Sequence, residues 1–279
     1  MLPQKVDIVL STINNLQPIP SSVTRILKEI DNPYTSVTTI SEYIGLDQAL
    51  TAMVLKTSNS VLLGYKEKCS SITDAVMRIG FKLLKAILFA QFSVGPMTGK
   101  LNGYRLGNDQ LWVHSLKIAM ISEWLARNLR YDDPEEAYIA GLLHDMGKLL
   151  LDQFVLEDYQ NIVRHVKQYH MPVWQAEEIH IGIDHAKLGG VMASRWNFAT
   201  SLIEGIQYHH IPSAAKLNQK LPAIVNLAHI MVIQNNDDEN ELLRVDLHPD
   251  TVKILNIHLK DLDQLSKGVN DFLSKKIES

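Results

Sequence analysis

Apolar residues recur at three- and four-residue intervals along most of the chain, which is the period of one buried face of an α-helix. In the first hundred residues these stripes occupy positions 6–16, 23–30, 40–44, 50–55 and 73–92. Prolines, glycines and short polar runs separate the stripes, as expected where one helix ends and the next begins. No alternation of apolar and polar residues, the sign of a strand, persists in this half. The pattern predicts an all-α fold, a multi-helix bundle.

Residues that cap helices mark several expected starts, because a Ser, Thr or Asp side chain accepts hydrogen bonds from the free N–H groups of the first turn. We expect starts at Ser21–Ser22, at Ser36 or Thr38–Thr39, at Asp47, at Thr73, at Asp132–Asp133, at Pro172 and at Asp184. The clearest is Asp132-Asp133-Pro134-Glu135-Glu136, with a capping aspartate, a first-turn proline and acids at the positive end of the helix dipole. A helix over 221–234 and one or two over 247–275 complete the expected set.

The composition narrows the class of protein. The chain has 279 residues, of which 46% are hydrophobic and 21% charged, so it can bury a core as ordinary globular proteins do. Its net charge of −4 favours neither nucleic acid nor an anionic membrane as a partner. Cys69 is the only cysteine, which excludes an intrachain disulfide and indicates a reducing compartment. Residues 1–5 do not resemble a secretory leader and the apolar run 86–92 is too short for a membrane span, so we expect a soluble cytoplasmic protein.

The clearest break in composition is Gly95-Pro96-Met97-Thr98-Gly99-Lys100. Its glycines and lysine do not form a phosphate-binding loop, because no strand precedes them and the full pattern is missing. We expect one helical subdomain over 1–100, a second over 101–236 that carries the chemistry, and a carboxy-terminal helical extension over 237–279 that follows a polar run at 235–241. Residues 1–236 are expected to form one functional unit.

His144-Asp145 is the most informative pair in the second half of the chain. It lies within Gly141-Leu142-Leu143-His144-Asp145-Met146-Gly147-Lys148, behind an apolar helical run and before a glycine. Asp145 should be partly buried, because only His144 is polar among the four residues before it. A buried carboxylate needs a cation, a metal or several hydrogen-bond donors. Lys148 would supply the cation in a simple ion pair, and a metal ion is the alternative.

Five further histidines lie on or beside the expected helices of this half. They are His114, His185, His209, His210 and His229. His114 shares an apolar helical face, and His185 follows the capping Asp184, where a neutral imidazole suits the positive end of a helix better than a charged one. Taken singly, such histidines are more often packed in a core or solvated at a helix end than bound to metal. Together with His144-Asp145 they predict a metal site, since helical bundles build di-metal sites from imidazole and carboxylate ligands on several helices.

The predicted site would bind one or two divalent transition-metal ions, of iron, manganese or zinc. Such an ion lowers the pKa of a bound water, so that hydroxide forms near neutral pH, and it can orient a phosphate for in-line attack. Lys148 lies where its charge could stabilise negative charge that develops on phosphate oxygens.

The chain resembles the HD superfamily of metal-dependent phosphohydrolases, and more closely its HDOD branch, the HD-related output domain of bacterial signalling, over residues 7–235. The resemblance rests on a series of motifs that occur in the right order. They are Leu16-Gln17-Pro18-Ile19-Pro20, residues 47–56 with Asn59-Ser60, residues 71–75 with Ile79-Gly80, residues 143–148, residues 185–190, Arg195-Trp196-Asn197 and His209-His210. The implied fold is an HD-like helical bundle with an amino-terminal helical subdomain.

The resemblance also implies the metal ligands. Position by position, it assigns them to His114, His144, Asp145, His185 and His209, with His210 as a further candidate. His229 stands where the late aspartate completes the HD site, and it can still bind a metal. Gln110 stands where some binuclear relatives have a glutamate, and the Gly-Tyr-Pro motif of the cyclic di-GMP phosphodiesterases is absent after His210. Lys148 matches a lysine of catalytically competent relatives.

Two functions follow from this resemblance. The first is a bacterial signal-transduction domain that retains part of the HD metal site and acts through signalling proteins as partners. The alternative is a metal-dependent phosphohydrolase, a phosphodiesterase or nucleotide phosphatase, in which Asp145 and Lys148 are catalytic and the ligand is a phosphate-containing small molecule or nucleotide. The missing acidic ligands and the missing substrate motif favour the signalling domain.

Overall fold

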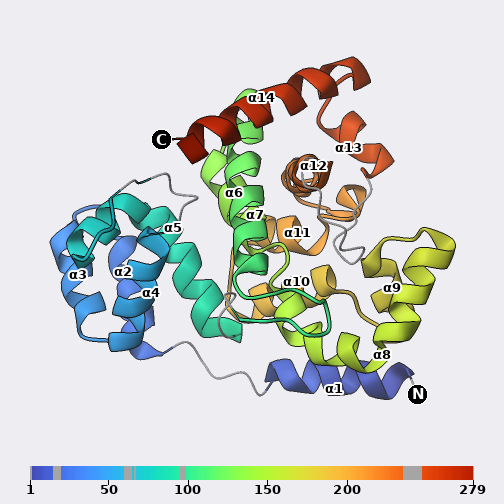
Figure 1. Ribbon diagram of the computed structural model, residues 1–279, viewed down its shortest axis with the longest axis horizontal. Coiled ribbons are helices and arrows are strands. Elements are labelled where there is room, and N and C mark those ends of the chain that lie inside the picture. The colour runs from blue at the N-terminus through green and yellow to red at the C-terminus, as the bar shows by residue number, and fades with distance from the viewer. Residues whose placement is uncertain are drawn as a thin grey trace. The chain divides into compact units, whose positions relative to one another are not determined.

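The described chain is helical (Figure 1). The computed structural model describes residues 2–14, 20–59, 65, 67–94, 99–234 and 247–278. Within these ranges there is no strand, and an isolated antiparallel bridge joins Leu101 to Leu106. The predicted all-α class is therefore confirmed. Residues 16–19 of the first motif, the predicted break at 95–98 and the polar run 235–241 lie outside the described residues.

The chain divides into two compact units. The smaller comprises Gln17–Gly95 with Asn270–Ser279, and the larger comprises Met1–Leu16 with Pro96–Val269. The amino-terminal helix α1 (Leu2–Asn14) belongs to the larger unit, where it contacts α8 (Gly147–Tyr169) and where Lys5 forms an ion pair with Asp158. The expected division at residues 100 and 236 stays a prediction.

The smaller unit is built on α5 (Ile72–Val94), against which α2 (Ser21–Ile30), α3 (Val37–Gly45) and α4 (Gln48–Ser58) pack. α5 bends at Gly80, whose φ of 74° lies in the left-handed region that favours glycine. The core consists of aliphatic side chains at helical spacing. Its buried members include Val23, Ile26, Ile40, Ile44, Leu50, Val54, Val76 and Leu84.

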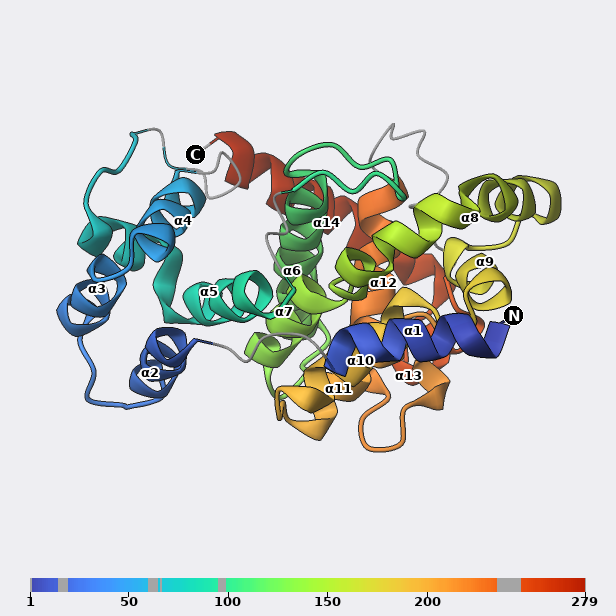
Figure 2. The ribbon, with the colours of Figure 1, turned by 90° about the horizontal axis from the view of Figure 1, so that it is seen from below.

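The larger unit contains the second half of the helices. They are α6 (Gln110–Asn128), α7 (Pro134–Leu143), α8, α9 (Val173–His180), α10 (His185–Arg195), α11 (Thr200–Gln207), the 3₁₀ turn η2 (Pro212–Ala214), α12 (Lys220–Gln234), α13 (Pro249–Ile254) and the first part of α14 (Leu259–Glu278). α6, α7 and α12 pack against one another, α10 packs against α8 and α11, and α9 packs against α8 (Figures 1 and 2). None of the described helices is both long enough and apolar enough to span a bilayer.

Most of the predicted helix starts are confirmed by a side-chain cap. Ser36, Asp47, Asp133 and Asp184 each accept the backbone N–H three residues further on. Pro172 directly precedes α9, as predicted. The carboxy-terminal stretch forms two helices, α13 and α14, which was one of the two expected outcomes.

Two predicted caps were wrong by one or two residues. α2 begins at Ser21 with no side-chain cap, because the extended Pro20 precedes it and places both serines inside the first turn. α5 begins at Ile72, and the N–H of Asp74 donates to Ser71 Oγ at 3.4 Å, so Ser71 caps the helix in place of Thr73. In both stretches the predicted hydroxyl residues lie inside the first turn of the helix and not at the residue that precedes it.

Two glycines let the helices of the larger unit approach closely. A methyl group on Gly141 would lie 2.7 Å from Ser122 Oγ and 2.9 Å from Ala119 Cα, so α7 packs directly on the backbone of α6. A methyl group on Gly147 would overlap the carbonyl oxygen of His185, so the start of α8 touches the start of α10. These contacts bring the turn between α7 and α8, which carries His144 and Asp145, against the neighbouring helices.

Candidate metal centre

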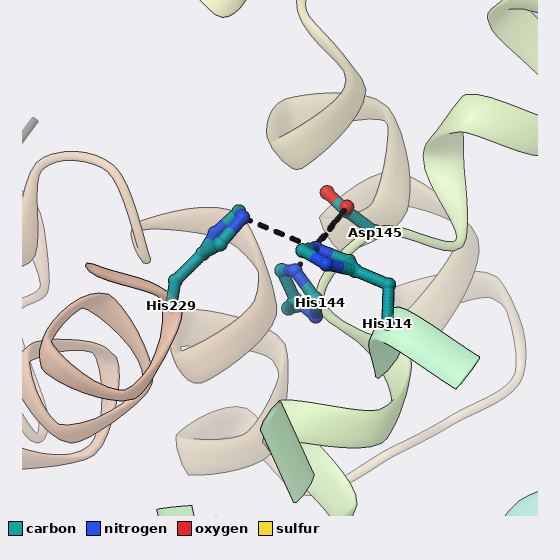
Figure 3. A group of neighbouring side chains, drawn as sticks. All are labelled: His114, His144, Asp145 and His229. Carbon is teal, nitrogen blue, oxygen red and sulfur yellow. Dashed lines mark hydrogen bonds and ion pairs between the residues drawn. The ribbon is translucent and has the colours of Figure 1, made fainter. Parts of the chain in front are cut away.

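The seven predicted ligand residues are brought together inside the larger unit. His114 comes from α6, His144 and Asp145 from the turn between α7 and α8, His185 from the first residue of α10, His209 and His210 from the turn after α11, and His229 from α12. Every one is buried, with at most 8% of its surface exposed. They form two groups in which the ligand atoms lie within 4.8 Å of one another. The groups are His114, His144, Asp145 and His229, shown in Figure 3, and His185, His209 and His210.

Asp145 links the two groups. Its Oδ2 lies 3.3 Å from His144 Nε2 and 3.5 Å from His114 Nε2, and its Oδ1 lies 3.2 Å from His185 Nε2. The buried Lys148 ammonium donates to Oδ2 at 2.7 Å, which is the ion pair expected from the sequence. The carboxylate therefore has imidazole nitrogens of both groups and one fixed cation around it.

Two of the histidines are oriented by backbone carbonyls of their own turns. His144 Nδ1 donates to the carbonyl of Gly141 and His209 Nδ1 to that of Ile206, both at 2.7 Å. A carbonyl oxygen only accepts, so Nδ1 of each ring carries a proton and Nε2 is the nitrogen left to bind a metal. Both Nε2 atoms are buried without a hydrogen-bond partner among the described residues. This pairing of one anchored nitrogen with one open nitrogen is the usual arrangement of metal-binding histidines.

His185 is oriented by a carboxylate. Glu177, on α9, is fully buried, and its Oε2 accepts both the Nδ1–H of His185 at 2.7 Å and the backbone N–H of the same residue at 2.9 Å. The hydroxyl of the fully buried Tyr104 donates to the other oxygen, Oε1, at 2.8 Å. Sequence reasoning missed both residues. Glu177 could have been found because it lies with Val173 and Ala176 on the buried face of α9, where a carboxylate needs a partner. No feature of the neighbouring sequence distinguishes Tyr104.

The remaining histidines face members of the same groups. His114 Nε2 and His229 Nε2 lie 3.1 Å apart, and His210 Nε2 lies 2.9 Å from His185 Nε2. The ring of His210 also stacks on Trp174, with ring centroids 5.6 Å apart and planes tilted by 13°. Gln110 does not join them: it is exposed at the start of α6, and its side chain accepts the N–H of Gly107.

Burial and charge set the protonation of the site. Burial lowers the pKa of His114 to about 4 and holds the pKa values of His209, His210 and His229 well below 6.5. Burial also opposes the charged form of His185, but the Glu177 carboxylate outweighs it and raises the pKa of His185 to about 9. Burial alone would raise the pKa of Asp145, yet His144 and Lys148 hold it well below its usual range. Four neutral imidazoles and an ionised carboxylate are the forms in which these groups bind metal.

The residues fit a divalent transition metal. His209 Nε2 is buried without a hydrogen-bond partner among the described residues, and His144 Nε2 and Asp145 Oδ1, which also lack a hydrogen bond there, have the longer contacts with Asp145 Oδ2 and His185 given above. Such groups are costly to bury unless something pairs with them. A set of imidazole nitrogens with one carboxylate oxygen suits zinc, iron or manganese better than calcium or magnesium, which prefer oxygen ligands. The buried histidine and aspartate cluster could therefore hold a metal ion.

The fold and this cluster define an all-α, HD-like helical protein with a buried candidate metal centre. The HDOD domain model matches residues 16–212, so the chain belongs to the HDOD domain family, as the sequence motifs predicted. A curated relative, an uncharacterized protein from Treponema pallidum, is 26% identical over 222 residues. That match covers 79% of this chain and 42% of the relative, so the chain spans less than half of the relative's length.

Solved structures share the fold. An HDOD domain protein of unknown function from Geobacter sulfurreducens matches with a TM-score of 0.69 and 25% identity, over 98% of this chain and 95% of the other. A candidate phosphohydrolase from Shewanella amazonensis SB2B matches with a TM-score of 0.68 and 25% identity, over 97% and 96% of the two chains. A candidate signal transduction protein from Marinobacter aquaeolei VT8, 19% identical, shares the fold with a TM-score of 0.68 over 99% of this chain and 66% of its own.

Proposed function

We propose that this chain is a metal-binding HDOD domain of bacterial signal transduction that acts through protein partners. One observation carries the proposal. Three buried histidines (His144, His185 and His209) each have Nδ1 held by a carbonyl or carboxylate and turn Nε2 toward the interior of the site that Asp145 occupies. Two of these nitrogens, of His144 and His185, lie 3.3 and 3.2 Å from Asp145, and that of His209 is buried without a hydrogen-bond partner among the described residues, an arrangement that core packing alone does not require. We infer that they bind one or two divalent ions of zinc, iron or manganese. His185, whose pKa is raised to about 9, would release its Nε2 proton when it binds the metal.

The ligands couple the helices of the larger unit. His114, His185 and His229 belong to α6, α10 and α12, and the HD pair lies between α7 and α8. A bound ion would supply a strong cross-link among these elements, and binding to the folded state alone stabilises it by about 2.7 kcal/mol at a hundred times the dissociation constant. Metal binding would therefore change the stability of the helices that carry the ligands. A signalling domain needs such a change, because a partner protein can respond to it.

Burial supports a signalling role over turnover. The seven ligand side chains are at most 8% exposed, and Lys148 is 1% exposed, so a phosphate ester has to displace protein atoms to reach them. The Lys148 ammonium is also committed to Asp145 Oδ2 at 2.7 Å. The exposed Gln110 and the missing Gly-Tyr-Pro motif remove two further features of hydrolytic relatives.

One observation favours the alternative, a metal-dependent phosphohydrolase. Lys148 places a positive charge inside the site beside Asp145, where it could bind a phosphate oxygen of a nucleotide or another phosphate ester. In that reading Asp145 and Lys148 are the catalytic residues, and a bound metal supplies an activated water.

Metal analysis and metal add-back test the proposal. Purified protein should contain zinc, iron or manganese, and Asp145→Ala and His209→Ala should weaken Zn²⁺ binding by more than about 100-fold, since even partners outside the ligand set are worth about 10- to 100-fold. His209→Ala leaves no buried charge unpaired, so its loss of binding is separable from misfolding. His165→Ala is the matched control, because His165 pairs with His180 outside the site at 3.2 Å and should not affect Zn²⁺ affinity.

A hydrolysis screen separates the two functions. We expect no turnover of phosphate esters or cyclic dinucleotides by the wild-type protein with Mn²⁺ or Fe²⁺. Turnover that Asp145→Ala abolishes would overturn the signalling-only function, whereas protein that neither contains nor binds metal would overturn the metal centre itself.

A further inference from the structure

A short hairpin at residues 101–106 is clamped onto α8. Leu101 and Leu106 exchange backbone hydrogen bonds at 2.9 and 3.0 Å, and the turn between them carries Tyr104. Asp152 of α8 accepts three backbone N–H groups of this turn, from residues 102, 103 and 104, at 2.8 to 3.2 Å. A methyl group on Gly103 would overlap the carbonyl oxygen of Asp152, so only glycine allows so close a fit. The hairpin therefore holds Tyr104 in one place against α8.

Tyr104 reaches two residues of the metal centre from this position. Its hydroxyl donates to Glu177 Oε1 at 2.8 Å, and Lys148 Nζ lies 5.6 Å from the centre of its ring. Burial and the Glu177 carboxylate raise the pKa of Tyr104 well above 10, so the hydroxyl keeps its proton and remains the donor. Because Glu177 Oε1 accepts the hydrogen bond from Tyr104, Oε2 is the oxygen that remains for His185.

Glu177 thus divides its two oxygens between two partners. Oε1 accepts from Tyr104, and Oε2 accepts from the ring and the backbone of His185. The carboxylate is fully buried, so without the tyrosine hydroxyl Oε1 would lose the hydrogen bond from Tyr104 and the group would be free to turn. A turn of the carboxylate would loosen the bond that holds His185 Nδ1 and would change the direction in which His185 Nε2 points.

We propose that Tyr104 is a positioning residue of the metal centre, which acts through Glu177 to fix the ring orientation of His185. The inference rests on the proposed function and deepens it, because it makes the hairpin at 101–106 a determinant of metal affinity. Tyr104 reaches His185 through Glu177, so we expect its effect to pass through the Tyr104–Glu177–His185 hydrogen bonds. In proteins of known metal content, outer partners of this kind change affinity by about 10- to 100-fold.

A double-mutant cycle on the full chain tests the inference. Zn²⁺ affinity is measured by competition with a chromophoric chelator for wild type, Tyr104→Phe, Glu177→Gln and the double variant. We expect Tyr104→Phe to weaken Zn²⁺ binding about 10-fold and to have little further effect once Glu177 is Gln. Tyr131→Phe is the matched control, because it removes another tyrosine–glutamate hydrogen bond, from Tyr131 to Glu136, at a place outside the seven ligand residues. Independent, additive losses would overturn the relay.

A second readout needs no metal. The downfield Nδ1–H proton resonance of His185, assigned by its loss in His185→Gln, should shift in Tyr104→Phe and stay in place in Tyr131→Phe. Wild-type protein that binds no Zn²⁺ would overturn the proposed function while leaving this test intact. Wild-type affinity together with an unshifted resonance in Tyr104→Phe would overturn the positioning role. If Tyr104→Phe does not fold, Glu177→Asp replaces it, since the shorter carboxylate cannot reach both partners and should also weaken Zn²⁺ binding.

Discussion

The interiors of the two units are built from different chemistry. All eleven histidines of the chain lie in the larger unit, and none lies in the smaller one. Among the described residues, the buried polar side chains of the smaller unit are the hydroxyls of Ser41, Thr57 and Ser58, whereas those of the larger unit include two aspartates, a lysine, two glutamates and six histidines. An aliphatic core is stable by burial alone, but buried ionisable groups lower stability unless each has a partner. The smaller unit therefore has an interior that packing alone explains, whereas the larger unit buries ionisable side chains that gather at the candidate metal centre.

A fall in pH should destabilise the larger unit much more than the smaller one, and this is the largest difference that we expect between them. The pKa values of His114, His209, His210 and His229 are lowered in the folded state, so these groups contribute stability above pH 6.5 and lose it as the pH falls below that value. Each contributes a slope of about 1 kcal/mol per pH unit in that range. His185 acts in the opposite direction: its pKa of about 9 gives stability below pH 6.5 that is lost as the pH rises toward 9.

Metal-free protein should therefore be most stable near pH 6.5 to 7 and lose stability steeply toward pH 5. Urea unfolding at a series of pH values, followed by hydrogen exchange resolved by segment, measures this. We expect helices α6, α10 and α12 to lose protection at pH 5 before α2 to α5 do. If the helices of both units lost protection at the same pH, the expected difference in acid stability between the units would be wrong.

Lys148→Met should destabilise the metal-free protein by about 4 kcal/mol, because it leaves the buried Asp145 carboxylate without its cation. Saturating Zn²⁺ should recover part of that loss, since a bound cation would take over the charge that Lys148 supplied. Urea titrations of both proteins with and without Zn²⁺ measure the difference. A loss that is the same in both conditions would argue against a cation site at Asp145.

Ile40→Ala should cost about 3 kcal/mol in the smaller unit, because it leaves a cavity among fully buried aliphatic side chains. The Zn²⁺ affinity of the larger unit should be unchanged. Thermal unfolding and chelator competition on the same preparation provide the two values. A fall in affinity without loss of the folded state would show that the aliphatic core also supports the metal centre.

The local pattern was enough to predict the helices and most of their starts. Asp133 and Asp184 cap α7 and α10 because capping depends only on a short polar side chain and the three residues that follow it. At α5 the same rule selected Thr73, but Ser71, two residues earlier, accepts the N–H of Asp74, so this prediction was wrong.

The predicted ligand residues also came from local signals. His144-Asp145 and the other histidines are recognisable by residue type and by their motifs, and the structure gathers all seven. That they bind a metal stays a prediction. Their division into two groups joined by Asp145 depends on distances across α6, α10 and α12, which no local pattern contains.

The residues that orient the ligands are the part that only the tertiary structure decided. Glu177 is 73 positions from Tyr104 and eight from His185, and Asp152 contacts a hairpin about fifty positions earlier in the chain. Nothing in the local sequence identifies the partners of this tyrosine in a turn or this glutamate on a short helix. Packing buries both residues and places the tyrosine hydroxyl and His185 on the two oxygens of the glutamate. The sequence by itself determined the helices and the ligand types, because both follow from neighbours along the chain. The tertiary structure decided burial, protonation and orientation, because these depend on neighbours in space.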